Sequence, residues 1–152
     1  MAIDIGASAP DFELKNAAGE PVTLSHYAGT PVLLVFYPFT FTGTCEGELC
    51  RIRDDYSEFE GAGVQVLAVS CDSRHAQRVW REQQGYQFPF LSDFWPHGAA
   101  AKAYGVFNEA VGCANRASFL ISADGVVIDA FESGDLGTPR EAQRYSEALA
   151  KL

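Results

Sequence analysis

Residues 38–45 (PFTFTGTC) place a cysteine at the junction of two predicted secondary-structure elements. The apolar run at 31–37, rich in β-branched and aromatic residues, predicts a buried strand, and residues 46–59 predict a helix. At the start of a helix the backbone N–H groups lack partners within the helix, and the helix dipole is positive. This setting favours a thiolate over a thiol at Cys45, and the thiolate is the nucleophilic form of cysteine.

The predicted helix also has a face that includes this cysteine. Cys45, Leu49, Ile52, Tyr56 and Phe59 are spaced by four, three, four and three residues, so they form one stripe that faces the core. The thiol therefore points inward at the first turn and is shielded from bulk water. Taken alone, this position fits a small buried apolar residue as well as it fits a nucleophile.

The rest of the chain reads as alternating strands and helices around one core. A length of 152 residues with 47% apolar content suits one well-buried core, and no linker or repeat divides it, so we expect a single domain over 1–152. The order of the elements predicts an α/β fold with a mixed central sheet flanked by helices and an N-terminal β-hairpin. In chain order we expect a hairpin at 11–14 and 22–24, a strand at 31–37, a helix at 46–59, a strand at 64–71, a helix from a cap at 72–73 to 84, an extended segment at 88–91, a helix at 97–104, a hairpin at 117–121 and 126–131, and a helix at 140–152 capped by Thr138.

Composition and charge exclude several classes of function. A net charge of −9 argues against nucleic acid or an anionic membrane as a partner, because both require a basic surface. The N-terminus lacks the features of a signal peptide and no apolar run is long enough for a membrane span, so we expect a cytoplasmic protein. In that compartment four cysteines do not indicate structural disulfides. The histidines lack ligand spacing and there is no Cys-x-x-Cys pair, so neither a metal nor an organic cofactor is implied.

Thr42 and Pro38, which both precede Cys45, could assist its chemistry. Thr42 lies three residues before Cys45, within reach of a hydroxyl hydrogen bond to the sulfur or to a bound substrate, and it could equally cap the helix. Pro38 ends the predicted strand and removes one donor from the loop.

The spacing Pro38-x-x-x-Thr42-x-x-Cys45 resembles the active-site motif of the peroxiredoxins, which are thiol peroxidases on a thioredoxin-like fold. The segments 93–98 (DFWPHG) and 105–108 (GVFN) are most similar to the AhpE-type subgroup. The resemblance covers nearly the whole chain and implies a thioredoxin-like fold of the peroxiredoxin type. It also includes residues 6–12 (GASAPDF), 69–73 (VSCDS), 90–93 (FLSD), 103–106 (AYGV) and 115–121 (NRASFLI).

The resemblance implies a role for each residue of the motif. Cys45 would be the nucleophile that attacks a peroxide and becomes a sulfenic acid. Arg116 matches the active-site arginine of the family, whose fixed charge favours the thiolate and whose fork can hydrogen-bond the peroxide. Thr42 would bond the peroxide or the sulfur, and the N–H groups of Thr44 and Cys45 would hold the attacked oxygen. Pro38 would cover the thiolate.

Glu48 lies one turn beyond Cys45, where an unpaired carboxylate would oppose the thiolate. By resemblance to the family, we expect Glu48 to orient Arg116 instead. Without the motif, Arg116 would be interpreted as a solvated charge at the start of a strand.

Cys50 follows Cys45 by five residues, which on an intact helix is about 140° around the axis and about 7.5 Å along it. A disulfide between them would require unwinding of at least the first helical turn. This spacing resembles the Prx Q (bacterioferritin comigratory) subgroup, in which the second cysteine resolves the sulfenic acid and thioredoxin or a similar dithiol protein reduces the disulfide. The alternative is a one-cysteine mechanism, with direct reduction by a low-molecular-weight thiol or a glutaredoxin-like protein.

The remaining cysteines and aromatic residues leave alternatives open. Cys71 ends a predicted buried strand and is interpreted as packing, whereas Cys113 is either a loop thiol without a special role or another resolving cysteine. By resemblance we expect a homodimer around the active site. Its contact could be lined by Trp80, Phe94, Trp95 and Phe107, which could equally fill the core.

The sequence thus predicts a thiol-dependent peroxidase that reduces hydrogen peroxide, organic hydroperoxides or peroxynitrite. A general thiol–disulfide oxidoreductase on the same fold is disfavoured, because the chain lacks Cys-x-x-Cys and has Thr42 and Arg116. A non-enzymatic peroxide sensor would use the same residues and differ only in its slow recycling.

Overall fold

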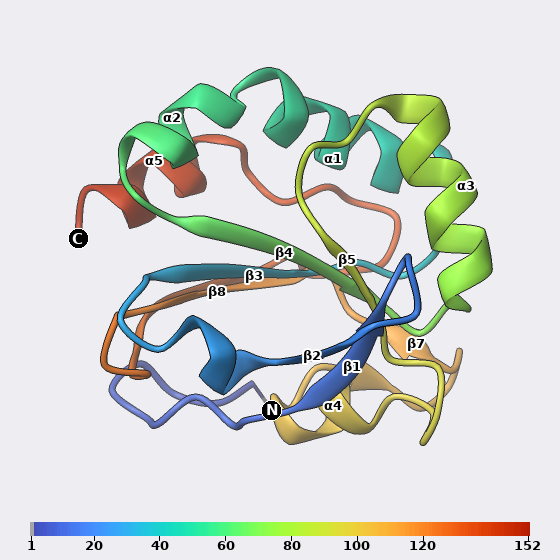
Figure 1. The fold of residues 1–152 in the computed structure, drawn as a ribbon, viewed down its shortest axis with the longest axis horizontal. Coiled ribbons are helices and arrows are strands. Elements are labelled where there is room, and N and C mark those ends of the chain that lie inside the picture. The colour runs from blue at the N-terminus through green and yellow to red at the C-terminus, as the bar shows by residue number, and fades with distance from the viewer. Residues whose placement is uncertain (1) are drawn as a thin grey trace.

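A mixed sheet of seven strands forms the centre of the protein in a computed structural model that describes residues 2–152 (Figure 1). Strands β3, β4 and β5 are parallel, and β1, β8 and β9 pair antiparallel with their neighbours. The mixed sheet and the N-terminal hairpin β1–β2 confirm the predicted class. Across the sheet the order is β2 (Pro21–Thr23), β1 (Glu13–Asn16), β5 (Phe90–Ser92), β4 (Gln65–Ser70), β3 (Val32–Phe36), β8 (Ala117–Ile121) and β9 (Val127–Glu132).

Helices cover both faces of the sheet and divide the apolar core in two. In β3, Val32, Leu34 and Phe36 belong to one cluster and Leu33 and Val35 to the other, because alternate side chains of a strand point to opposite faces. All five residues of β3 are buried, as expected for a central strand covered on both sides. One face carries α1 (Gly43–Asp54), α2 (Tyr56–Gly61), α3 (Arg74–Gln84) and α5 (Gln143–Leu149), and the other carries η1 (Leu24–Tyr27) and α4 (Ala99–Ala103) (Figure 1).

The helix predicted over 46–59 is wrong in its boundaries. It begins at Gly43, so Cys45 lies inside the first turn, and it is interrupted at Asp55, whose φ of −96° and ψ of 14° are not helical. Aspartate has a low helix propensity, although the Asp55 side chain itself makes no capping hydrogen bond. The apolar stripe survives the break, since Cys45, Leu49 and Ile52 are buried in α1 and Phe59 in α2.

The C-terminal helix is also shorter than predicted. It begins at Gln143, so Arg140 lies before it, and Thr138 does not cap it but donates a hydrogen bond of 3.0 Å to Asp135 Oδ2. By contrast, α3 has the predicted ends, with the Ser73 hydroxyl accepting from Ala76 N and Gly85 in the left-handed region at φ 68°. A small hairpin of β6 (Phe107–Asn108) and β7 (Cys113–Ala114) was not expected, because two-residue strands carry no periodicity.

The aromatic residues proposed for a dimer contact separate into two groups. Trp80 is fully buried in the core between α3 and the sheet, so it cannot line a dimer contact, and the alternative that it fills the core is correct. Phe107 is half-buried, while Phe94 and Trp95 are 53% and 82% exposed. None of the helices in residues 2–152 combines the length and apolar character that a membrane crossing requires.

Candidate active site

The antiparallel pairing of β3 with β8 brings the predicted nucleophile and arginine together. Phe36 at the end of β3 pairs with Ala117 at the start of β8, so Arg116 lies beside the loop that leads to α1. Its Nη1 lies 3.2 Å from Cys45 Sγ, and its Nε donates to Leu136 O at 2.7 Å. Cys45 is fully buried and Arg116 is 4% exposed, so the alternative of a solvated surface charge is wrong.

Glu48 connects Arg116 to a second buried arginine. Its carboxylate accepts from Arg116 Nη1 at 2.8 Å, from Arg140 Nε and Nη2 at 3.0 Å each, and from Arg140 N at 2.7 Å. Burial alone would raise the pKa of Glu48, but the charge of Arg140 and these hydrogen bonds outweigh it, so the pKa lies below its ordinary value. Glu48 therefore carries its charge next to the arginine that contacts the thiol.

Arg140 is the main residue of the site that the sequence did not reveal. Its Nη1 donates to Phe36 O at 2.6 Å and to Ser118 Oγ at 3.3 Å, which ties it to the ends of the same two central strands. The sequence placed Arg140 at the start of the predicted C-terminal helix and gave it no role at the site. Its partners are 22 to 104 residues away, so no local pattern could have identified it.

The loop before Cys45 holds Thr42 in a different hydrogen bond from the one expected. Thr42 has the extended backbone of a helix N-cap, but its hydroxyl donates to Phe39 O at 2.7 Å, not to the sulfur. Its oxygen can still accept a hydrogen bond from a peroxide. The first helical hydrogen bond runs from Glu46 N to Thr42 O, so the N–H groups of Thr44 and Cys45 precede it, as expected.

Asp72 anchors this loop, which is strained. Phe41 has a φ of 64°, in the left-handed region that is unfavourable for a bulky side chain. Next to it, Thr40 N donates to Asp72 Oδ2 at 2.8 Å, and Ser70 Oγ donates to the same oxygen at 2.7 Å. The sequence assigned Asp72 only to a helix cap. Pro38 is buried, lies two residues after the end of β3, and begins the loop.

Cys50 lies on α1 five residues beyond Cys45, and all four cysteines are free thiols. Cys50 is half-buried, and its sulfur faces the end of α3, 3.5 Å from the Tyr86 hydroxyl and 3.7 Å from Gln84 Oε1. The helix is continuous from Gly43 to Asp54, so joining the two sulfurs would require it to unwind.

The other two cysteines lie in settings that suppress nucleophilicity. Burial, with the charges of Asp93 and Cys113 as lesser causes, raises the pKa of Cys71 to about 12. Cys113 is fully buried in β7 and not in a loop, and burial also raises its pKa.

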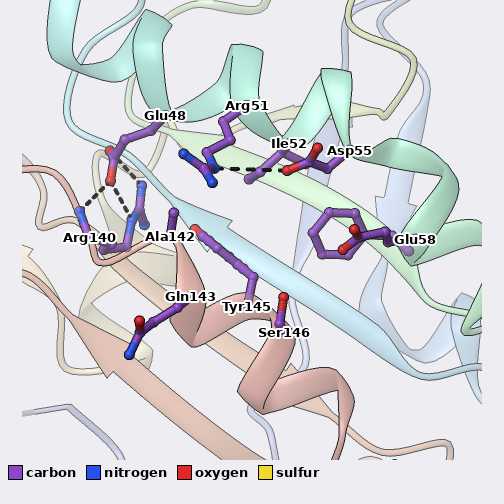
Figure 2. Close-up of a pocket in the computed structure, with 11 residues that line it drawn as sticks. Glu48, Arg51, Ile52, Asp55, Glu58, Arg140, Ala142, Gln143, Tyr145 and Ser146 are labelled. Carbon is purple, nitrogen blue, oxygen red and sulfur yellow. Dashed lines mark hydrogen bonds and ion pairs between the residues drawn. The ribbon is translucent and has the colours of Figure 1, made fainter.

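Two surface hollows adjoin this group of residues. One, of about 380 Å³, lies between α1, α2 and α5, with the Glu48–Arg140 pair at one end and an exposed Arg51–Asp55 pair nearby (Figure 2). The other, of about 430 Å³, is lined by Arg116 and by residues after β9. Within residues 2–152, no three His, Cys, Asp or Glu side chains are arranged to hold a metal ion.

Comparison with known proteins agrees with this geometry. Residues 5–130 match the AhpC/TSA family. The chain is 45% identical to alkyl hydroperoxide reductase E of Mycobacterium tuberculosis, over 99% of this chain and 98% of the relative. It is 33% identical to chloroplastic peroxiredoxin Q of Sedum lineare, over 80% and 65%.

A solved structure matches the whole architecture. The crystal structure of peroxidoxin BcpB from Mycobacterium tuberculosis superposes with a TM-score of 0.87 at 30% identity, covering 98% of this chain and 96% of that one. This likeness confirms the thioredoxin-like fold of the peroxiredoxin type. The chain belongs to the AhpC/TSA family of peroxiredoxins, as the motif that ends at Cys45 predicted.

Proposed function

We propose that this protein is a thiol-dependent peroxidase whose nucleophile is Cys45. The observation that carries the proposal is the Arg116 guanidinium, 3.2 Å from a buried Cys45 sulfur at the start of a helix. A fixed positive charge and free helical N–H groups both favour the thiolate at that place. The related proteins named as peroxiredoxins and as an alkyl hydroperoxide reductase support the same chemistry.

The first step transfers one peroxide oxygen to sulfur. The Cys45 thiolate attacks the distal oxygen, an S–O bond forms, and the O–O bond breaks. The leaving oxygen takes a proton and departs as water or an alcohol, and Cys45 becomes a sulfenic acid. Arg116 and the N–H groups of Thr44 and Cys45 stabilise the charge as it moves from sulfur to oxygen, and Thr42 accepts from the peroxide hydroxyl.

The second step removes the sulfenic acid. In our proposal Cys50 attacks the Cys45 sulfur to give an intrachain disulfide and water, and thioredoxin or another dithiol protein then reduces the disulfide. The raised pKa values of Cys71 and Cys113 make those two thiols weaker candidates. The competing proposal is direct reduction of Cys45 by a low-molecular-weight thiol or a glutaredoxin-like protein, which avoids unwinding α1.

We further propose that a single domain, working as a homodimer, carries this reaction. Exposed Phe94 and Trp95 are apolar residues that such a contact could cover. Hydrogen peroxide, organic hydroperoxides and peroxynitrite are the expected substrates.

One mass measurement tests both steps. The reduced protein is treated with one equivalent of hydrogen peroxide, alkylated, and analysed as the intact chain and as peptides. Loss of two hydrogens, mapped to Cys45 and Cys50, is the expected result, and Cys50→Ser should instead trap one added oxygen on Cys45. One oxygen on Cys45 of the unmodified protein would favour the one-cysteine mechanism, and an unreactive Cys45 would refute the proposed peroxidase.

Repeated turnover with a reductant separates an enzyme from a sensor. An enzyme consumes many equivalents of peroxide per chain in the presence of thioredoxin or a small thiol. A sensor oxidises once and recycles slowly.

A further inference from the structure

The first turn of α1 has few features that stabilise a helix. Gly43 and Gly47 lie in its first five residues, and a Cβ added to either would meet nothing within 4 Å, so packing does not require glycine there. Glycine is the least favourable residue for a helix after proline. The N-cap residue Thr42 gives no side-chain support, since its hydroxyl bonds Phe39 O.

The second part of α1 is held firmly against the end of α3. Arg53 Nη1 donates to Gln84 O at 2.6 Å, and Gln87 Nε2 donates to Arg53 O at 3.2 Å. Leu49 and Ile52 are buried in the core, and Glu48 is held by two buried arginines. This part of the helix therefore has packing and polar contacts that resist unwinding.

Two side-chain contacts hold the first turn on its two sides. One is Arg116 to the Cys45 sulfur, and it weakens when the charged thiolate becomes a neutral sulfenic acid. The other is Gln84 Nε2 to Glu46 Oε1 at 2.8 Å. Gln84 also receives the Cys50 thiol on its Oε1, so the same amide touches both the turn and the second sulfur.

We infer that Gly47 is the hinge at which α1 unwinds after oxidation, and that Tyr86 and Gln84 keep Cys50 in place to receive Cys45. This inference rests on the proposed resolution by Cys50. The two peptide units from Cys45 to Gly47 span at most about 7 Å when extended, which lets Cys45 swing back toward a stationary Cys50.

The disulfide forms when Cys50 attacks the oxidised Cys45. Cys50 loses its proton, and the Tyr86 hydroxyl, 3.5 Å from the sulfur, donates to the resulting thiolate. The thiolate attacks the Cys45 sulfur, the S–S bond forms and the S–O bond breaks. Hydroxide leaves and takes up the proton that Cys50 released, giving water.

The hinge is tested with Gly47→Ala, which strengthens the helix without a steric clash. Disulfide formation after one equivalent of peroxide should slow about fivefold, the ratio expected from the helix propensities of the two residues. The rate at which Cys45 is oxidised should stay unchanged, and excess peroxide should convert more of it to the sulfinic acid. Gly61→Ala, at the open end of α2, is the matched control and should form the disulfide at the normal rate.

The role of Tyr86 in holding Cys50 is tested with Tyr86→Phe. This substitution keeps the ring that packs on Trp80, Phe88 and Phe90. Loss of the hydroxyl should slow disulfide formation and move its pH profile to higher pH, because the Cys50 thiolate loses a donor. A merely structural role of Tyr86 would lower stability and leave the pH profile in place.

The outcomes distinguish this inference from the proposed function. If the unmodified protein forms no Cys45–Cys50 disulfide, the proposed resolution fails and the inference falls with it. If the disulfide forms but Gly47→Ala matches both the unmodified protein and Gly61→Ala, the hinge is refuted while the resolution stands. An unshifted pH profile in Tyr86→Phe would overturn the role of Tyr86.

Discussion

Replacing Arg140 with methionine should test whether the buried ion network holds the active site together. The Arg140 and Glu48 side chains are 1% and 6% exposed, so the substitution leaves a buried carboxylate with Arg116 as its remaining cation. It also removes the donor to Phe36 O at the end of β3. Breaking a buried ion pair from one side costs about 3–5 kcal/mol, which for a domain of this size lowers Tm by about 6–20 °C.

The pKa of Glu48 gives this prediction a pH dependence. That pKa is depressed in the folded state, so its contribution to stability is present above the ordinary value of 4.5 and is lost as the pH falls through the lower folded value. The difference in the free energy of unfolding between the unmodified protein and Arg140→Met should therefore be full at pH 7. This difference in the free energy of unfolding should become smaller when unfolding is measured at pH values closer to 3.

Urea unfolding and the rate of peroxide reduction measure the two consequences. With Arg116 held less firmly, the second-order rate with hydrogen peroxide should fall about tenfold or more. Arg51→Met is the matched control, because that arginine is 67% exposed and forms a 3.8 Å pair that should contribute only about 0.5 kcal/mol. An Arg140→Met protein as stable and active as this control would refute the network as a support of the site.

Three further predictions concern other parts of the chain. Asp72→Ala removes the acceptor that holds the strained loop and should slow peroxide reduction about tenfold, whereas Asp72→Asn should slow it less. Equal rates in Asp72→Ala and the unmodified protein would count against Asp72 as the anchor of the loop. With a pKa of about 12, Cys71 is a thiolate in only about one part in ten thousand at pH 8, so iodoacetamide should label Cys50 in the native protein long before Cys71. Gly98→Ala forces a side chain to a φ of 72° and into the Phe107 ring, which should cost about 2–4 kcal/mol by urea unfolding; a neutral effect would contradict the packing there.

The sequence predicted the sheet and most of its helices because their signals are local. The apolar run that forms β3, the Ser73 and Gly85 ends of α3 and the hairpin β8–β9 each depend on residues close together in the chain. The break at Asp55 was missed because the apolar stripe continues through it into α2. The start of α5 was predicted three residues too early, because Arg140 is compatible with a helix when only its neighbours in the chain are considered.

The candidate site divides in the same way. Cys45 and its neighbours form a short motif, so the sequence by itself identified the proposed nucleophile, whereas Arg116 was assigned only by resemblance to the family. The sequence could not reveal that Thr42 bonds its own loop or that Asp72 anchors that loop. Nor could it reveal that Cys50 faces Tyr86, because these contacts depend on how the elements pack.

The amino-acid sequence alone therefore indicated the family and the proposed nucleophile, which follow from the motif that ends at Cys45, and the fold class, which follows from the order of locally predicted elements and from the resemblance. Only the tertiary structure decided how the charge at the site is balanced. Antiparallel pairing brings Arg116 to the thiol, and Arg140 reaches Glu48 from 92 residues away. Such a contact is set by the packing of α1 against the sheet and the segment before α5, and no pattern along the chain encodes it.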